Sequence, residues 1–197
     1  DQDILNRELS HRLKNTLSMV LAIATQTLRP VKERQYVEAF ERRVHALSTA
    51  HDVLFERNWS SAAIVQVMER TFDRLSVRDR VGLQGEDLTF GPKGTLSLSL
   101  LLHELTTNAI KYGALSNTTG KVVLRWYLTG EGENTTFHLD WQEIGGPPVH
   151  DVDKAGFGSK LIKMGLGGTG KVDVRYESSG LILRMEATLH QLQQAEH

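Results

Sequence analysis

The polar side chains with the clearest chemical potential lie in the stretch from Leu101 to Ser116, which reads LLHELTTNAIKYGALS. Glu104, Asn108 and Lys111 are separated by four and then three residues, so they stack along one face of a predicted helix. A carboxylate and an amide carbonyl are oxygen ligands that suit hydrated magnesium, and a lysine beside them suits phosphate oxygens. On the helix alone, a solvated face with a network of Glu and Lys side chains is an equally good interpretation.

A second group of candidate residues lies between two predicted β-hairpins further along the chain. Trp141 opens the segment WQEIGGPP, and Gly156 opens GFGS ahead of an apolar helical piece. Glycines before a helix let backbone amides approach phosphate, although GFGS is also an ordinary turn, and the chain contains no Walker A sequence. Glu143 followed by Gly145 at a strand end could accept a hydrogen bond from an exocyclic amine and leave room for a flat ring.

A third candidate is His11 in the first helical segment. It lies on a polar face with Lys14 and Asn15, away from the apolar residues Leu9 and Leu13. Packing does not explain an exposed imidazole among polar residues, but an ordinary surface histidine is the commoner case for such a residue on its own. His51 lies on an apolar stripe and is expected to be a core or interface histidine.

Two long amphipathic helices are predicted to carry the N-terminal candidates. Apolar residues recur by fours and threes from Ile4 to Pro30, and again from Val31 to Leu54. The short connection predicts an antiparallel hairpin. Because such a hairpin has little core of its own, we expect it to form a four-helix bundle with a second copy, which makes the protein a homodimer.

The pattern changes at residue 60, where we place a domain boundary between 1–59 and 60–197. Ser60 or Ser61 is expected to cap a helix that ends near Leu75. Further on, Pro92 suits the first turn of the helix that contains Glu104.

Short strands follow in pairs. Alternating segments at 121–128 and 135–141 predict one hairpin, and those at 171–176 and 181–189 predict another. The fold class is therefore α+β: a helical hairpin followed by an α/β sandwich with a mixed, mostly antiparallel sheet.

The composition excludes several classes of function. With 23 basic and 24 acidic residues, the chain lacks the positive charge expected of a dedicated nucleic-acid binder. The absence of cysteine excludes thiolate sites and is compatible with the cytoplasm, where we expect the protein to be. No apolar run reaches the roughly 18 residues needed to span a membrane. Because the chain opens inside a helical pattern, we expect it to be a piece of a longer protein.

Three separate stretches resemble the HWE family of bacterial sensor histidine kinases. They are ELSHRLKN at 8–15, HELTTNAIKYGALS at 103–116, and WQEIGGPPV with GFGSKLI. Both features that characterise the family are present, namely His103 opening the asparagine-containing box and the Trp141-x-Glu143 sequence. The resemblance covers nearly the whole chain, and it implies a dimerisation and histidine-phosphotransfer hairpin followed by a Bergerat-type ATP-binding domain.

The resemblance also implies roles for individual residues, with ATP and Mg²⁺ as cofactors. His11 would be the phosphoacceptor, Asn108 a magnesium ligand, and Glu104 the residue that orients a metal-bound water or assists proton transfer. The implied nucleotide-binding residues are Asn108, Lys111, Tyr112, Glu143, Gly145, Gly156, Phe157, Gly158 and Ser159.

The chain departs from many histidine kinases immediately after the phosphoacceptor, where Arg12 replaces the usual acid. Glu8, one turn earlier, could serve as the base, and Asn15 could orient the imidazole. Arg12 could instead steady the charge on a transferring phosphoryl group. The sequence gives no role to His103 or Trp141 beyond packing.

The resemblance implies autophosphorylation of His11 from Mg-ATP, followed by transfer to an aspartate of a response-regulator receiver domain. It also implies an upstream sensor domain, for which a PAS-type domain is one possibility. Two rival functions are an ATPase or phosphatase in which Glu104 activates water, and a non-catalytic nucleotide-binding dimeric scaffold.

Overall fold

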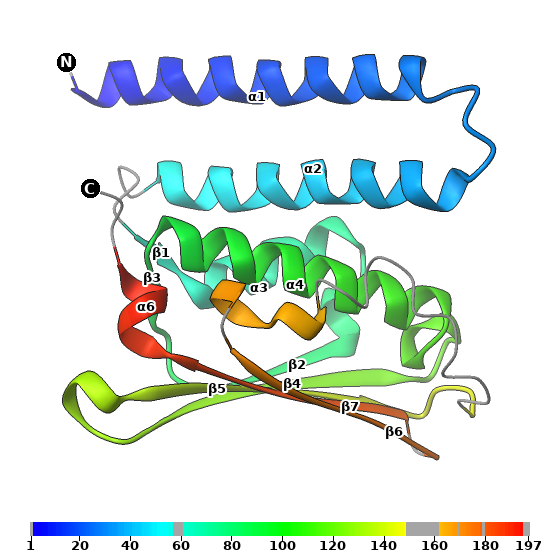
Figure 1. Cartoon of the computed structure of the whole chain (residues 1–197), viewed down its shortest axis with the longest axis vertical. Coiled ribbons are helices and arrows are strands. Elements are labelled where there is room, and N and C mark those ends of the chain that lie inside the picture. The colour runs from blue at the N-terminus through cyan, green and yellow to red at the C-terminus, as the bar shows by residue number, and fades with distance from the viewer. Residues whose placement is uncertain (1, 57–60, 149–161, 169, 179, 195–197) are drawn as a thin grey trace.

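The structure is a computed structural model, and it describes residues 2–56, 61–148, 162–168, 170–178 and 180–194. Its helices and strands form layers (Figure 1), with α1 outermost, then α2, then α3 and α4, and finally a five-stranded sheet. Helix α4 therefore lies between α2 and the sheet.

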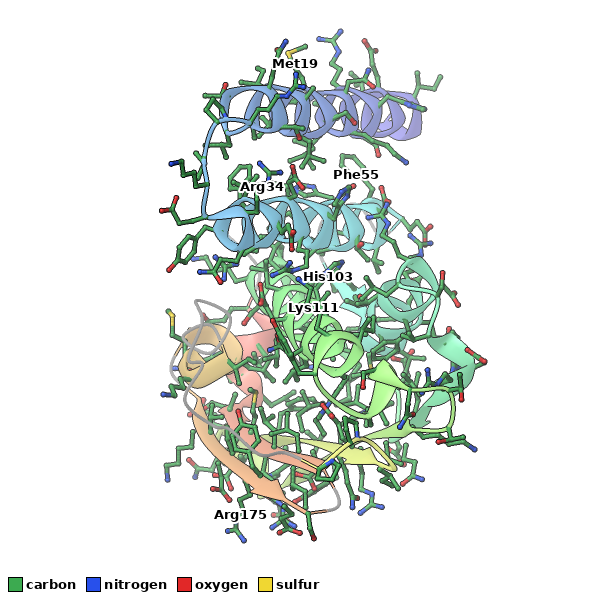
Figure 2. The ribbon with its side chains drawn as sticks, turned by 90° about the vertical axis from the view of Figure 1, so that its right-hand side faces the viewer. Met19, Arg34, Phe55, His103, Lys111 and Arg175 are labelled. Atoms are coloured by element: carbon green, nitrogen blue, oxygen red, sulfur yellow. The ribbon has the colours of Figure 1, made fainter. Side chains whose placement is uncertain are left out.

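The first two helices form the predicted antiparallel hairpin. α1 spans Gln2–Thr27 and α2 spans Arg34–Phe55, with Pro30 in the connection between them. α1 turns Leu13 and Leu17 towards α2, where both are half-buried. Other apolar side chains of α1 remain exposed: Ile4, Leu5, Leu9, Met19, Val20 and Ile23. In Figure 2 Met19 points away from the rest of the molecule, so α1 has an uncovered apolar face.

The main sheet is mixed and mostly antiparallel, as predicted. Its strand order is β2-β4-β5-β7-β6. Only the β2–β4 pair is parallel among these neighbours. The strands are β2 (Val81–Gln84), β4 (Lys121–Thr129), β5 (Thr136–Ile144), β6 (Lys171–Glu177) and β7 (Gly180–Thr188).

Helices cover one face of this sheet, and their apolar sides form the core. These helices are α3 (Ile64–Arg74), α4 (Pro92–Lys111) and the short α6 (Leu189–Gln193). Trp141 of β5 is fully buried and lies against Phe72 of α3, with ring centroids 6.5 Å apart. On the opposite face of the sheet, Arg175 points away from the helices (Figure 2). This alternation is the period-2 pattern that predicted the strands.

The predicted serine cap of α3 is wrong. The helix begins at Ile64 after Ala63, and the first-turn N–H of Val65 donates to Asp87 Oδ1 at 3.3 Å, so the side chain at this end comes from Asp87. Residues Ala62–Ala63 instead form β1, which pairs with β3 at Thr89–Phe90. The pairing sets where the helix starts, because those backbone groups belong to a ladder. Pro92 does lie in the first turn of α4, as predicted.

Candidate functional site

Helix α2 runs antiparallel along the polar face of α4. Three contacts define the register of the two helices: as the residue number falls along α4, the residue number of its partner on α2 rises. The polar contacts are Lys111 Nζ to Glu38 Oε2 at 3.0 Å, Arg43 Nε to Glu104 Oε1 at 3.3 Å, and Ser99 Oγ to the Ala46 carbonyl oxygen at 2.8 Å. The face that carries three of the candidate residues is therefore covered by α2 in this structure.

Glu104 is buried under α2, with 3% of its side chain exposed. Its ionic partner is Arg43, and the partner of Lys111 is Glu38, so Glu104 and Lys111 are not paired with each other. The interpretation of Glu104 as part of a solvated face does not hold. A buried carboxylate needs an opposite charge nearby, and α2 supplies it.

Asn108 lies between these two ion pairs along the same helix and is half-buried. Its side chain forms no hydrogen bond with another residue in the described ranges. Tyr112 follows the end of α4 and is 72% exposed. The donor set fits a magnesium ion and phosphate oxygens chemically, provided that α2 does not cover it.

His103 lies between α4 and α2 (Figure 2) and is only 4% exposed. Burial lowers its pKa to about 4, helped by the nearby charges of His45, Arg42 and Arg74. The imidazole is therefore neutral near pH 7. This burial agrees with the packing interpretation of His103, and the structure specifies the contact as the one between α2 and α4, which the sequence did not predict.

Glu143 is held in place at the end of β5 and is 3% exposed. Its Oε2 accepts a hydrogen bond from the backbone N–H of Ala114 at 2.8 Å, and its Oε1 accepts one from Trp141 Nε1 at 3.2 Å. Burial raises the pKa of Glu143, and the two hydrogen bonds oppose this. Trp141 therefore orients the carboxylate besides filling the core. A carboxylate has about four acceptor positions, so Glu143 can still accept from a ligand.

The loop that follows α4 packs directly against the segment that follows β5. Asn117 Nδ2 donates to the carbonyl oxygen of Gly145 at 2.8 Å. A Cβ on Gly146 would come within 2.7 Å of Ala114 Cα, and a Cβ on Gly113 would overlap the Glu143 carboxylate. The fold thus brings Glu143 and Gly145 to the end of the helix that carries Asn108, Lys111 and Tyr112. Gly156, Phe157, Gly158 and Ser159 lie outside the described residues.

His11 is exposed on α1, apart from the residues above. Glu8 and Arg12 pair with each other at 2.6 Å, and Asn15 is exposed. The flanking residues Ser10 and Leu13 line a small pocket with residues of the C-terminal half of α2: Ser48, His51, Asp52 and Phe55. From Glu38 to Asp52 is about 20 Å along a helix. The structure therefore does not bring His11 to the polar face of α4.

Arg80 is a residue that the sequence did not single out. It lies in the 3₁₀ helix η1 (Arg78–Arg80) and donates hydrogen bonds to backbone carbonyls of the loop after α4. No local pattern could have identified it, since the contacts span 34 to 40 residues of sequence.

No helix in the described ranges is long and apolar enough to cross a membrane.

Comparison with known proteins connects these features to a family. The family model of HWE histidine kinases matches residues 8–87. The blue-light-activated histidine kinase of Brucella anthropi is 38% identical over 194 residues, which are 96% of this chain and 40% of that protein. The corresponding protein of Brucella ovis is 36% identical over 191 residues, covering 94% and 39%. The chain thus spans about two fifths of the length of these curated relatives.

The fold matches a solved structure as well. The histidine kinase domain from the Erythrobacter litoralis blue-light activated histidine kinase has a TM-score of 0.63 with this chain at 18% identity. The match covers 98% of this chain and 97% of that domain, so the whole architecture, hairpin included, is shared.

Proposed function

Since the chain belongs to the HWE histidine kinase family, we propose that it transfers the γ-phosphoryl group of ATP to His11 and then to an aspartate of a response-regulator receiver domain. The observation that carries the proposal is the meeting of Glu143 with the end of α4. It combines a buried acceptor, tight glycine packing, an amide side chain without a hydrogen bond in the described ranges, and an ammonium group in one place.

In this proposal the chain divides into two working parts. Residues 1–59 form the dimerisation and phosphotransfer hairpin, and residues 60–197 form the ATP-binding domain. The uncovered apolar face of α1, with Leu9, Val20 and Ile23, supports pairing of the hairpin with a second copy. ATP as the phosphoryl donor favours the cytoplasm as the compartment.

The nucleotide would lie across the end of α4. Glu143 would accept a hydrogen bond from the exocyclic amine of adenine, with Gly145 beside the ring. Lys111 and Tyr112 would lie on the nucleotide, with Lys111 contacting phosphate oxygens. The glycine segment at 156–159, with Phe157 and Ser159, would complete the phosphate side.

The chemical step needs little covalent work from the protein. A nitrogen of neutral His11 forms a bond to the γ-phosphorus as the bond to the β–γ bridging oxygen breaks, which leaves ADP. Magnesium, when bound, supplies positive charge near the phosphate oxygens; Asn108 would hold it, and Glu104 would orient a water on it. The histidine proton would pass to water or to Glu8, with Asn15 orienting the ring and Arg12 steadying phosphoryl charge.

The position of α2 sets a condition on this reaction. Lys111 and Glu104 are already paired with Glu38 and Arg43 of α2. His11 belongs to α1, which lies on the side of α2 opposite to α4 (Figure 1). We therefore place phosphoryl transfer in a different arrangement, in which α2 has left the polar face of α4. In that arrangement His11 of the same chain or of a second copy can reach the nucleotide.

The decisive experiment is labelling with [γ-³²P]ATP and Mg²⁺, followed by identification of the modified residue. The His11→Gln variant should show no labelling yet bind ATP as the unaltered chain does. The matched control is His190→Gln, which changes an exposed histidine of α6 and should label normally. Undiminished labelling of His11→Gln would refute the phosphoacceptor, and phosphate release without any phosphohistidine would favour the rival ATPase function.

The regulator can be tested in the same system. Phosphorylated chain mixed with a receiver domain should lose its label as the receiver aspartate gains it. A sensor domain upstream, of PAS or another type, would act on this reaction through α1.

A further inference from the structure

Arg80 spans the two ends of the loop that leads from α4 to β4. Its Nη2 donates to the carbonyl oxygens of Gly120 at 2.6 Å and Ala114 at 3.2 Å. Nε donates to Gly120 at 3.0 Å, and Nη1 donates to Leu115 at 3.4 Å. A guanidinium presents its donors in a planar, fixed fork, so this one side chain fixes the spacing between both ends of the loop.

Ala114 is held from both sides by charged groups. Its N–H donates to the carboxylate of Glu143, and its carbonyl oxygen accepts from the guanidinium of Arg80. Hydrogen bonds with one ionised partner are shorter and stronger than neutral ones. The orientation of the Glu143 carboxylate is therefore linked to Arg80 through a single residue of backbone.

Asn117, in the same loop, connects Ala114 and its neighbours to Gly120 and Gly145 through side-chain hydrogen bonds. Asn117 Oδ1 accepts from the N–H groups of Thr119 at 3.1 Å and Gly120 at 2.7 Å, while its Nδ2 donates to Gly145. A Cβ on Gly120 would overlap the carbonyl oxygen of Ala114, so the loop closes tightly on itself. Its geometry depends on Arg80 at the point of closure.

We propose that Arg80 is a positioning residue for recognition of the nucleotide base. Arg80 fixes the position of Ala114, whose N–H donates to one oxygen of Glu143. This hydrogen bond orients the carboxylate so that it can accept from an exocyclic amine of the base. The inference rests on the proposed function of Glu143 as the base-reading acid. Arg80 acts through the loop and is not itself a catalytic residue.

The test compares binding of ATP with binding of inosine triphosphate, which lacks the exocyclic amine, to the 197-residue chain. In Arg80→Ala the affinity for ATP should fall about three- to tenfold, the scale of one hydrogen bond, while affinity for inosine triphosphate changes little. The ratio between the two nucleotides should therefore approach one. A general loss of stability would lower the affinities for both nucleotides by the same factor and leave their ratio unchanged.

Two further variants define the role. Arg78→Ala changes the other arginine of the same 3₁₀ helix, which donates to the Val81 carbonyl oxygen and pairs with Glu69, so it should keep the ratio of the unaltered chain. Arg80→Lys keeps the charge but not the fork, so it should lose discrimination nearly as far as Arg80→Ala. If Arg80→Ala does not fold, Arg80→Lys supplies the measurement.

Hydrogen exchange separates this inference from the proposed function. The amides of Ala114 and Gly120 should exchange faster in Arg80→Lys than in Arg78→Ala. The inference would be overturned if the unaltered chain prefers ATP over inosine triphosphate and the Arg80 variants keep both this affinity ratio and the exchange rates of the unaltered chain. An unaltered chain that does not prefer ATP would instead refute the base-reading role of Glu143, even with faster exchange in the Arg80 variants.

Discussion

The two ends of the candidate site are held together in different ways. On the phosphate side of the proposed site, Lys111 meets Glu38 of α2 in a partly exposed ion pair, while Glu104 meets Arg43 of α2 in a buried one. On the base side, Glu143 meets the loop after α4 through backbone atoms and glycines at contact distance. Contacts between exposed charged side chains are weak and easily exchanged, whereas buried backbone contacts are not. The difference predicts that the base side of the proposed site is preformed, and that Lys111 on its phosphate side becomes available only when α2 moves.

The largest expected effect separates the two ends by function. Asn108→Ala should lower labelling from ATP about a hundredfold, the scale of losing one electrostatic stabiliser, while discrimination between ATP and inosine triphosphate persists. Asn134→Ala, at an exposed turn residue, is the control and should label normally. Equal labelling by Asn108→Ala would place the magnesium ligand elsewhere and remove the functional contrast.

Lowering the pH should destabilise the contact between α2 and α4. His103 has its pKa lowered from 6.5 to about 4, so its contribution to stability is complete above pH 6.5 and is lost as the pH falls towards 4. The loss between pH 6.5 and 5 should be about 2 kcal/mol. Urea unfolding at several pH values measures this.

The matching variant is His103→Gln, which should unfold with less dependence on pH over that range. His51 also has its pKa lowered by burial and remains in both proteins, so only the difference between the two curves reports on His103. Parallel curves would show that His103 is not kept neutral by the contact with α2.

Overpacking should act on the base side. In Gly113→Ala the new Cβ would displace the Glu143 carboxylate from the Ala114 N–H, and ATP affinity should fall about tenfold. Gly82→Ala is the control, because its Cβ would meet no atom closer than 3.9 Å. Unchanged affinity in Gly113→Ala would mean that this end of the site is as adaptable as the other.

The smallest expected effect is a gain. Glu38→Gln removes the anion on Lys111, so ATP affinity should rise about two- to fivefold, in keeping with a partly exposed ion pair. Glu41→Gln is a matched change on α2, since Glu41 accepts from Thr25 of α1 and should not affect ATP. A decrease in affinity in Glu38→Gln would show that α2 supports the nucleotide instead of competing with it.

The sequence predicted the elements of the fold better than the contacts between them. Alternation and turn residues identified the hairpins of β4–β5 and β6–β7, and the heptad-like spacing identified α1 and α2. These signals are local. The predicted start of α3 was wrong because β1 pairs with β3, and the paired residues Ala63 and Thr89 are 26 residues apart in the sequence.

For the candidate residues, the sequence predicted the shared helix face but not the side chains that contact it. The spacing of Glu104, Asn108 and Lys111 placed them on one face, but it could not show that α2 covers that face. The Lys111–Glu38 pair spans 73 residues, and Arg80 reaches the loop across as many as 40. Such pairs depend on how the layers stack, for which a single sequence carries no periodic signal.

The connection between α1 and α2 is short and internally bonded. The Val31 N–H donates to the Leu28 carbonyl oxygen at 3.0 Å, Arg34 Nη1 donates to the same oxygen at 3.3 Å, and Thr25 bonds to Glu41 across the hairpin. These hydrogen bonds connect α1 and α2 rigidly, so we expect the two helices to move together. Under the proposed function, a rotation applied at the N-terminal end of α1 would therefore move α2 away from Lys111 and move His11 at the same time. Access of ATP to its site and approach of the phosphoacceptor would then depend on a single movement.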